Sequence, residues 1–555
     1  MRVALMVSED VESMSSYDFL KEAESELGTK TANRVVGRFA AVSAMVRAFA
    51  KYGRHEYVVC PVGVPDAADW EELGSSIPMP LLAPKDLVAW ARDEPTVLFE
   101  LARHRLSRLS NLRSTMGLAQ IVVAAQMHGL GDPRLIDDLC VTLLSPIRTS
   151  DVIFASSQPA RLALQAALAE AQDVIRRRGG SVDLPRIVEV SLGIDSDQFT
   201  GGDRSKARQV LGWPDGEFVF LSLGRLSDSD KFDHRPLIRA FAKGAASWTV
   251  RVRLVIAGND GNDRSRAYVS DLQQLVEELG VADSVEIRNR FAPELRRMLY
   301  TGADAFLALS DSVGESFGLT VAEAQAAALP VIAVDWDGFR DQIDHGRSGL
   351  LVPTIWGDRL EDGAAWQLLA SGRELDLANA QTVGVDWSEF LRTMHQLVCM
   401  SDAERAAIGD AGCRVAHGRD WSNVVRKYEG IWENTHVTPS QPLLGDTHTR
   451  RSHIFRGYAT RLLDSSMSVA LGPLWDERGP YLNPAWDLQR TVCDAQLADE
   501  IVGVVWSKSG QRTRIEKIEQ RFADRSKGIV DWHILWLVKH GVLRIAIADP
   551  LGDSE

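Results

Sequence analysis

Two glutamates, Glu315 and Glu323, stand eight residues apart in the segment GESFGLTVAE. A glycine-rich turn spans Gly314 to Gly318, and a run of helix-forming residues follows it from Thr320 to Ala328. A turn that leads into a helix presents free backbone N–H groups and the positive end of the helix dipole, which favours an anionic ligand. If the helix begins near Gly318, Glu315 lies in the loop before it and Glu323 in its second turn, so both can face one ligand.

The spacing of this glutamate pair is compatible with three roles. The carboxylates could be a general acid and base, they could accept hydrogen bonds from ligand hydroxyl groups, or they could form an exposed helix face. Carboxylates that accept sugar hydroxyls suit a ligand with a neutral polar part beside an anionic one.

Two cations follow an apolar run that is typical of a strand. The run Phe218–Leu223 ends in Gly224-Arg225-Leu226, and Lys231 comes shortly after it. A loop at the carboxyl end of a parallel strand is where α/β sheets bind ligands. Arg225, through its planar fork, and Lys231, as a point charge, could hold a diphosphate there. The alternative is a pair of solvated surface cations.

His128 also follows an apolar run, Ile121–Ala125, and precedes Gly129. This position allows contact with a reacting group at the edge of a sheet. A single histidine of this kind is more often a structural hydrogen-bonding residue, so both interpretations stand.

The sequence favours neither a metal site nor a disulfide. Asp335-Trp336-Asp337 has the D-x-D form of a divalent-metal site, but three-residue matches are common and no histidine or glutamate lies beside it. The five cysteines are scattered without C-x-x-C spacing, which predicts reduced thiols. We therefore expect no metal and no required cofactor.

The elements that must position these residues form two series of strands and helices. Apolar runs that predict buried parallel strands occur in the first series at Arg2–Val7, Glu56–Val62, Thr96–Phe99, Ile121–Ala125, Val152–Ala155 and Ile187–Val190. The second series has such runs at Phe218–Leu223, Arg253–Ala257, Ser284–Arg288, Ala305–Leu309 and Pro330–Val334. Helical patterns lie between the runs, so we predict an α/β fold with two tandem Rossmann-like domains joined near residues 191–212.

Beyond Val352 the pattern becomes helical, and a helix with Asp420 as its cap is predicted at residues 420–434. A segment rich in Pro, Thr and Ser at 435–449 indicates a linker. Residues 450–555 are predicted to form an accessory domain, whose end from Ile515 to Ile547 has the pattern of a winged helix: a helix, a second helix and a short pair of strands. Residues 441–555 contain fifteen Lys and Arg and fifteen Asp and Glu. This balance argues against a DNA-binding surface and favours protein docking or internal packing.

The totals exclude several functional classes. A chain of 555 residues is too long for a single core. Its net charge of -14 argues against a general nucleic-acid binder. The N-terminus lacks the pattern of a signal peptide and no apolar run reaches membrane-spanning length, so we expect a soluble, cytoplasmic protein.

Taken together, these features resemble the family 4 glycosyltransferases of the GT-B fold. The resemblance covers roughly Met1 to Trp432 and is strongest from Phe218 to Pro353. The motifs that carry it are Gly224-Arg225-Leu226 with Lys231, the two glutamates in E-x7-E spacing, Gly349-Leu350-Leu351-Val352-Pro353, Ser191-Leu192-Gly193-Ile194-Asp195 with Phe199, and Asp420-Trp421-Ser422.

The resemblance implies two Rossmann-like domains that face a cleft: residues 1–190 on the acceptor side, closed by helix 420–434, and residues 191–419 on the nucleotide-sugar side. Arg225 and Lys231 would bind the diphosphate, Glu315 the donor sugar, and Glu323 the ribose. His128 would lie near the transferred sugar. The other donor-binding residues implied are Gly224, Arg290, Gly314, Ser316, Phe317, Gly318 and Leu319.

Such enzymes retain the configuration of the transferred sugar and need no metal, and the departing phosphate can take the proton of the acceptor. Neither glutamate is therefore assigned as the general base. Family members usually carry a Gly-Gly loop after the first strand, but here residues 8–30 are longer and acidic. The implied acceptor-side residues are Gly28, Asn33 and Gly37. A second departure comes later in the chain, where Asp341 stands in place of a glutamate that is usual in the family.

The function predicted from the sequence is therefore transfer of a sugar from a nucleotide-sugar to an acceptor. A protein or peptide recruited through residues 450–555 is one candidate for this acceptor. We expect no nucleic-acid partner. Two alternatives remain at this stage: a non-catalytic GT-B scaffold, and a nucleotide-sugar hydrolase or epimerase. A hydrolase or epimerase would need no acceptor groove.

Overall fold

The computed structural model describes residues 1–7, 37–61, 77–82, 87–92, 94–101, 105–115, 118, 120–131, 135–228, 231–245, 247–259, 263–292, 294–357, 372–435, 455–475, 493–507, 512–525 and 527–546. These residues form two compact units. Unit 1 contains residues 1–198, 316–323 and 414–449, and unit 2 contains residues 199–315, 324–413 and 450–555. Within the described ranges, no helix combines the length and apolarity needed to cross a bilayer.

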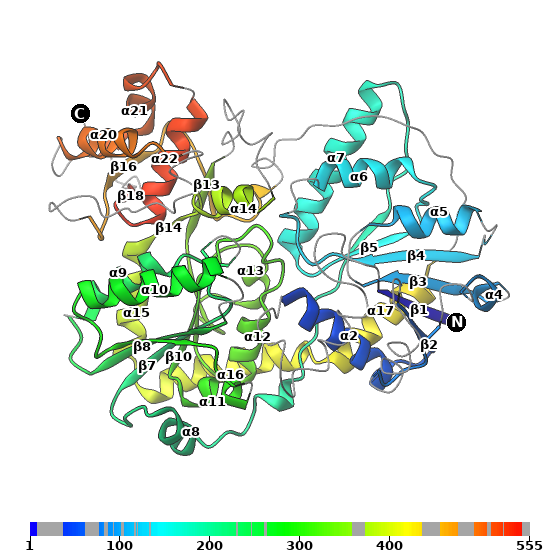
Figure 1. The fold of residues 1–555 in the computed structure, drawn as a ribbon, viewed down its shortest axis with the longest axis horizontal. Helices are drawn as coiled ribbons and strands as arrows, with labels where there is room; N and C mark the ends of the chain where they lie inside the picture. The colour runs from blue at the N-terminus through cyan, green and yellow to red at the C-terminus, as the bar shows by residue number, and fades with distance from the viewer. Residues whose placement is uncertain are drawn as a thin grey trace. The chain divides into compact units, whose positions relative to one another are not determined.

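Unit 1 is built on a six-stranded parallel sheet in the order β2-β1-β3-β4-β5-β6 (Figure 1). The strands are β1 (Arg2–Val7), β2 (Glu56–Pro61), β3 (Thr96–Glu100), β4 (Ile121–Gln126), β5 (Val152–Ala155) and β6 (Arg186–Glu189). The helices of this part are α2 (Gly37–Tyr52), α4 (Leu87–Ala91), α5 (Ser107–Thr115), α6 (Leu135–Leu144) and α7 (Gln158–Arg177). A strand occurs at each of the six predicted positions, and Val62, the predicted end of the second strand, lies outside the described residues. Apolar runs of this length suit strands that a parallel sheet buries on both faces.

Helix α17 (Trp421–Glu433) returns to this unit and completes its core. Its Tyr428 and Trp432 rings pack against Phe49, Phe99 and Phe154, with centroids 4.7–6.3 Å apart. Each such aromatic pair adds about 0.5–1.5 kcal/mol beyond the burial of area. The helix therefore contributes core side chains to the unit, as well as a cap at Asp420, whose carboxylate accepts a hydrogen bond from Ser422 N at 2.9 Å.

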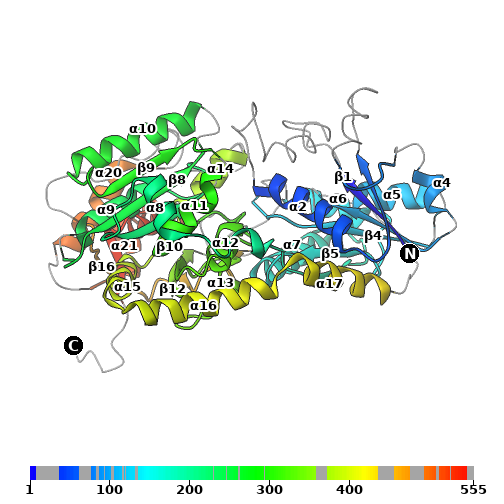
Figure 2. The ribbon, with the colours of Figure 1, turned by 90° about the horizontal axis from the view of Figure 1, so that it is seen from below.

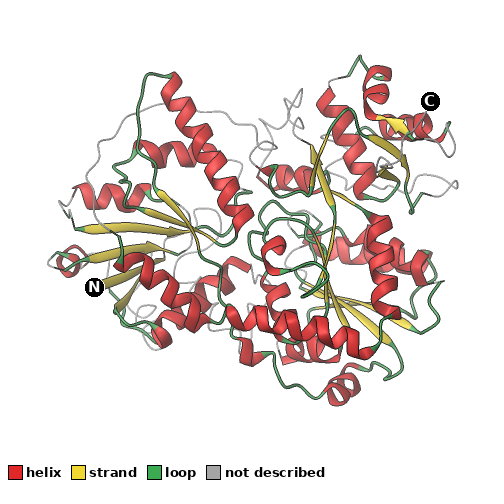
Figure 3. Ribbon diagram, turned by 180° about the vertical axis from the view of Figure 1, so that it is seen from behind, coloured by secondary structure: helices red, strands yellow, loops and turns green. Residues whose placement is uncertain are grey.

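Unit 2 is built on a second six-stranded parallel sheet in the order β12-β11-β10-β7-β8-β9. Its strands are β7 (Phe218–Leu223), β8 (Val252–Gly258), β9 (Val285–Asn289), β10 (Ala305–Ala308), β11 (Val331–Val334) and β12 (Leu350–Val352). The helices are α8 (Arg204–Leu211), α9 (His234–Ala245), α10 (Asp263–Glu278), α11 (Glu294–Gly302), α12 (Leu319–Ala326), α13 (Phe339–Gln342), α14 (Gly372–Ala380), α15 (Trp387–Cys399) and α16 (Asp402–Gly418). Helices flank the strands in both units, and α9 packs beside α10 (Figures 2 and 3). The predicted pair of Rossmann-like sheets is confirmed.

The C-terminal segment is joined to unit 2 by a shared sheet. Strand β15 (Arg461–Leu463) pairs in parallel with β13 (Thr354–Gly357), which also pairs with β14 (Gly384–Val385). A further sheet has the order β17-β16-β18 and consists of β16 (Ser468–Leu471), β17 (Thr513–Arg514) and β18 (Leu543–Ala546). The helices are α20 (Ala495–Trp506), α21 (Ile515–Arg521) and α22 (Lys527–Lys539), drawn in orange and red in Figure 1.

The strand at Thr354–Gly357 corrects the expectation that the chain becomes purely helical beyond Val352. Its partner β15 lies about a hundred residues later in the sequence, so no local pattern could reveal the pairing. Helix α22 packs on β13 and β14 and is buried along nearly its whole length. In a winged-helix protein this third helix usually enters the DNA groove, whereas here it faces the interior of unit 2.

Gly193 lies in the junction segment where Ile194 forms a bridge with Asp420. A Cβ atom at this position would stand 2.3 Å from the indole ring of Trp421. We expect Gly193→Ala to destabilise unit 1 by about 1–3 kcal/mol, because the ring must shift in a packed environment. The measurement is the melting temperature by calorimetry. The control is Gly216→Ala, where an added Cβ would meet nothing within 4 Å. Equal melting temperatures of the two variants would refute this prediction.

Two buried histidines of unit 2 make stability depend on pH. Burial lowers the pKa of His234 to about 4 and that of His540 to about 3, against ordinary values near 6.5. Between pH 6.5 and 4 the unfolded chain therefore takes up protons that the folded chain does not, and the free energy of unfolding falls as the pH falls. Each group contributes a slope of up to about 1.4 kcal/mol per pH unit.

We expect His540→Gln to reduce the pH dependence of the free energy of unfolding by the contribution of one histidine. The glutamine side chain can still form a hydrogen bond with Gln381, but it does not titrate. The ring of His540 contacts Gln381 Oε1 at 3.0 Å. The measurement is urea unfolding at several pH values from 4 to 7, with His395→Gln at an exposed position as the control variant. A slope unchanged from that of the wild type would contradict the assignment.

Candidate functional site

Three neighbouring strands of the second sheet end in loops that are bonded to one another. Gly224 N donates to Ala257 O at 3.0 Å, and Leu226 N donates to Asn259 O at 3.1 Å. Arg290 N donates to Gly258 O at 3.1 Å. The loops after β7, β8 and β9 therefore form one layer, which holds the backbone of Arg225 between the bonded positions 224 and 226.

This layer depends on a glycine at the end of β8. A Cβ atom on Gly258 would lie 1.7 Å from Gly224 O, so no other residue fits without separating the two loops. Arg290 has φ 53°, the left-handed region that non-glycine residues rarely adopt. An uncommon backbone conformation at a loop that borders a candidate ligand site is typical of a residue held in place by its surroundings.

Lys231 and Glu315 form an ion pair at the same edge of the sheet. Lys231 Nζ lies 2.5 Å from Glu315 Oε2, with side-chain exposures of 26% and 12%. The backbone of Lys231 is fixed from the loop after β10, because Ser310 Oγ donates to Lys231 O at 3.1 Å and Asp311 N donates to it at 3.3 Å. A charged pair in this partly buried position interacts more strongly than a surface pair.

The glycine-rich turn leads into α12 as the sequence predicts. Gly318 has φ 87°, and its carbonyl accepts from Val321 N at 3.1 Å, so the helix starts directly after it. Gly314 N donates to Ser312 Oγ at 3.1 Å and stabilises the start of the turn. Phe317 and Glu323 are buried. Gly314 and Glu315 lie in unit 2, whereas residues 316–323 lie in unit 1.

His128 is held by two contacts within unit 1. Its ring Nε2 lies 2.6 Å from Leu101 O, so this nitrogen carries the proton and donates. Ser316 Oγ donates to His128 O at 2.7 Å, and Ser156 Oγ donates to Ser316 O at 3.0 Å. The structure therefore brings His128 and Ser316 together through the backbone of the histidine, while its ring has the structural hydrogen bond that is common for a single histidine.

Asp337 is a buried carboxyl group that the sequence suggested only as part of a D-x-D pattern. Burial, together with the nearby charges of Glu315 and Asp341, raises its pKa well above the ordinary value. Its φ of 40° is again left-handed. Asp335 is engaged elsewhere, with Arg340 Nε at 3.0 Å and Thr460 Oγ1 at 2.7 Å. Within the part of the chain that the structure describes, no cluster of three metal-ligating side chains occurs.

The remaining predicted residues are divided between the two units. Gly28 and Asn33 lie outside the described residues, and Gly37 is the first residue of α2. Gly224, Arg225, Lys231, Arg290, Gly314 and Glu315 belong to unit 2, and Leu319 with the other residues of the turn belongs to unit 1. Two residues of the site were missed, Asp311 and its ion-pair partner Lys539, because 228 positions separate them in the sequence.

Part of the chain is similar in sequence to glycosyltransferases. Residues 203–377 match the family model described as glycosyl transferases group 1. A relative from Catenulispora acidiphila, named D-inositol 3-phosphate glycosyltransferase 2, is 35% identical over 185 residues, which are 33% of this chain and 42% of the relative. The chain thus matches less than half the length of that relative.

Solved structures with a similar fold share little sequence with this chain. Anabaena HepE in complex with UDP is 18% identical, with a TM-score of 0.51 over 78% of this chain and 100% of that chain. A glycosyltransferase from Rickettsia africae is 14% identical, with a TM-score of 0.50 over 78% of this chain and 98% of that chain. These structures share the two-domain GT-B fold. Residues 203–377 of this chain, which include Arg225, Lys231 and Glu315, therefore resemble the glycosyl transferases group 1 family in sequence.

Proposed function

We propose that the protein is a retaining glycosyltransferase that moves a sugar from a nucleotide-sugar to a small acceptor with a free hydroxyl group. The observation that carries the proposal is the Lys231–Glu315 pair at the carboxyl ends of the strands of the second sheet. A cation and a carboxylate in contact match a ligand whose diphosphate and sugar are joined at one bond. The fold and the group 1 match support this assignment.

Each member of the pair has a separate task in the proposed reaction. The ammonium of Lys231 attracts the diphosphate, and Arg225 adds a second cation from the same connection between β7 and α9, so the negative charge of the leaving group is stabilised as it develops. A bound diphosphate competes with Glu315 for Lys231. The carboxylate released in this way accepts hydrogen bonds from hydroxyl groups of the donor sugar.

The proposed reaction needs no metal ion and no protein general base. Fixed cations supply the positive charge that a divalent metal provides in other phosphate chemistry. The departing phosphate oxygen takes the proton of the acceptor hydroxyl as the new glycosidic bond forms on the same face. His128 contributes by position, since its ring proton is already donated to Leu101 O.

The acceptor is proposed to be a small molecule such as an inositol phosphate. The name of the relative from Catenulispora acidiphila supports this choice. The peptide acceptor expected from the sequence depended on the winged-helix pattern of residues 450–555. Helix α22 of this segment is buried inside unit 2, which removes the reason to assign it to peptide recruitment.

The donor is tested by a thermal-shift panel of UDP, GDP, ADP and their sugar derivatives. A nucleotide that binds the folded protein raises the melting point, and at about a hundred times its Kd it stabilises by about 2.7 kcal/mol. We expect UDP and its sugars to respond, because a protein of the same fold binds UDP. No response to any nucleotide would instead favour a scaffold function.

Lys231→Met is expected to weaken binding of the responding nucleotide by about 1.5–3 kcal/mol, roughly 10- to 100-fold, because it removes a charged hydrogen bond to the diphosphate. Isothermal calorimetry measures the Kd. Lys206→Met, which removes an exposed cation from α8 in the same unit, is the matched control. If both variants bind as tightly as the wild type, Lys231 is not a diphosphate ligand.

Glu315→Gln is expected to bind the nucleotide nearly normally and to lower the rate of sugar transfer by about 10²-fold, the usual size of one lost charge contact in the transition state. The assay follows nucleotide release from the donor, with and without inositol 3-phosphate, and nuclear magnetic resonance reads the anomeric configuration of the product. Glu277→Gln on α10 is the exposed control. A fully active Glu315→Gln enzyme would remove this residue from the mechanism.

A further inference from the structure

The last residue of α22 places a positive charge inside unit 2. The ammonium of Lys539 donates to a carboxylate oxygen of Asp311 and to Ala380 O, the latter at 3.0 Å. The two charged side chains are 1% and 2% exposed. Trp387 Nε1 donates to Lys539 O, so the backbone at this point is also held.

Asp311 belongs to the loop that fixes Lys231. Its backbone N–H and the hydroxyl of Ser310 both donate to Lys231 O. Lys539 Nζ also lies 5.7 Å from the ring centre of Phe232, the residue that follows Lys231. The buried cation therefore lies beside both the residue that follows Lys231 and the loop that donates hydrogen bonds to Lys231 O.

The depth of this ion pair makes packing alone a poor explanation. Removing a lysine and an aspartate from water costs several kcal/mol for each ion, and a pair of apolar residues of the same volume is often at least as stable. An ion pair does supply a directional attachment, since the carboxylate must stay within hydrogen-bond reach of the ammonium. Here that attachment fixes the loop on which the backbone of Lys231 depends.

The charges around Lys539 support the same interpretation. Asp233 lies in the loop after Lys231. Burial acts to raise the pKa of its carboxyl group, but the positive charges of Arg235 and Lys539 outweigh burial and hold the pKa below its ordinary value. Arg235 bonds to Asp233 at 3.2 Å. The segment 231–235 is thus surrounded by fixed charges, one of which comes from the C-terminal segment.

We propose that Lys539 is a positioning residue for the donor site, through which the C-terminal segment completes the binding of the donor diphosphate. This inference rests on the proposed function. Lys539 touches no substrate atom itself. It holds Asp311 and the loop after β10 so that Lys231 stays where the diphosphate binds.

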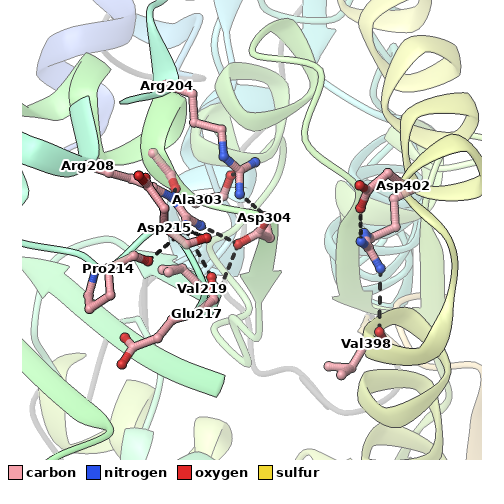
Figure 4. Close-up of polar contacts among 12 residues, drawn as sticks. Arg204, Arg208, Pro214, Asp215, Glu217, Val219, Ala303, Asp304, Val398 and Asp402 are labelled. Atoms are coloured by element: carbon pink, nitrogen blue, oxygen red, sulfur yellow. Dashed lines mark hydrogen bonds and ion pairs between the residues drawn. The ribbon is translucent and has the colours of Figure 1, made fainter. Parts of the chain in front are cut away.

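Strand β10, which ends shortly before Asp311, offers a matched control at its amino end. Asp304 precedes β10 and is paired with the buried Arg208, whose Nη2 lies 2.6 Å from Asp304 Oδ2 (Figure 4). Arg208 also donates to Gly302 O at 2.9 Å and to Pro214 O at 3.0 Å. Arg208→Met thus removes a comparable buried cation from unit 2, but at the amino end of the strand, away from the proposed site.

The experiment compares Lys539→Met and Arg208→Met in the full chain, with melting temperature and the Kd for UDP as the two readouts. We expect both variants to melt at lower temperature. Only Lys539→Met is expected to raise the Kd for UDP, by about 3- to 30-fold, the usual range for residues that act through a packed network. The KM for the donor should rise with the Kd.

Asp311→Asn provides a second test, because its amide can still accept a bond from Lys539 and the variant loses only the charge. We expect a smaller rise in Kd than for Lys539→Met. Unchanged Kd values in both variants would overturn the inference, as would equal rises for Lys539→Met and Arg208→Met. Failure of the wild type to bind UDP or any other nucleotide would overturn the proposed function as well, so the two failures are distinguishable.

Discussion

The parallel order of the second sheet is the constraint on which the candidate site depends. Because its strands run in the same direction, the loops after β7, β8, β9 and β10 all open at one edge. Gly258 lies so close to Gly224 that the backbones of the loops after β7 and β8 are in contact. No single loop forms the site. Its geometry results from hydrogen bonds between loops, and the ligand-binding side chains inherit their positions from those bonds.

Charge in this region is arranged in pairs with different environments. Lys231 and Glu315 are partly exposed, whereas Lys539 and Asp311 are enclosed. Asp337 is buried near Glu315, and burial together with that charge raises the pKa of its carboxyl group. The three carboxyl groups therefore occupy three environments: one lies in a partly exposed ion pair, one is buried with a raised pKa, and one is enclosed with a lysine.

Much of the fold and part of the site could be predicted from the sequence. Apolar runs such as Val152–Ala155 identify their strands because local hydrophobicity decides burial. The turn at Gly318 and the helix after it were also predictable, since a glycine with positive φ leaves a local signature. The direct contact between Lys231 and Glu315 could not be predicted, although the motifs place both residues on the same ligand. Long-range pairs such as Lys539 with Asp311, and β15 with β13, leave no periodicity in either segment.

The attachment of β15 to β13 has a consequence for the order in which the chain is made. Synthesis delivers the strands of the second sheet by residue 352, yet the third sheet and the cation beside Asp311 come from residues 461 to 539. Domains generally fold as units once their residues have emerged from the ribosome. The unit that contains the candidate site therefore reaches its final form more than a hundred residues after its central sheet, and α17 of the other unit is synthesised within that interval. A nascent chain interrupted before residue 539 lacks the lysine that pairs with Asp311 in the finished structure.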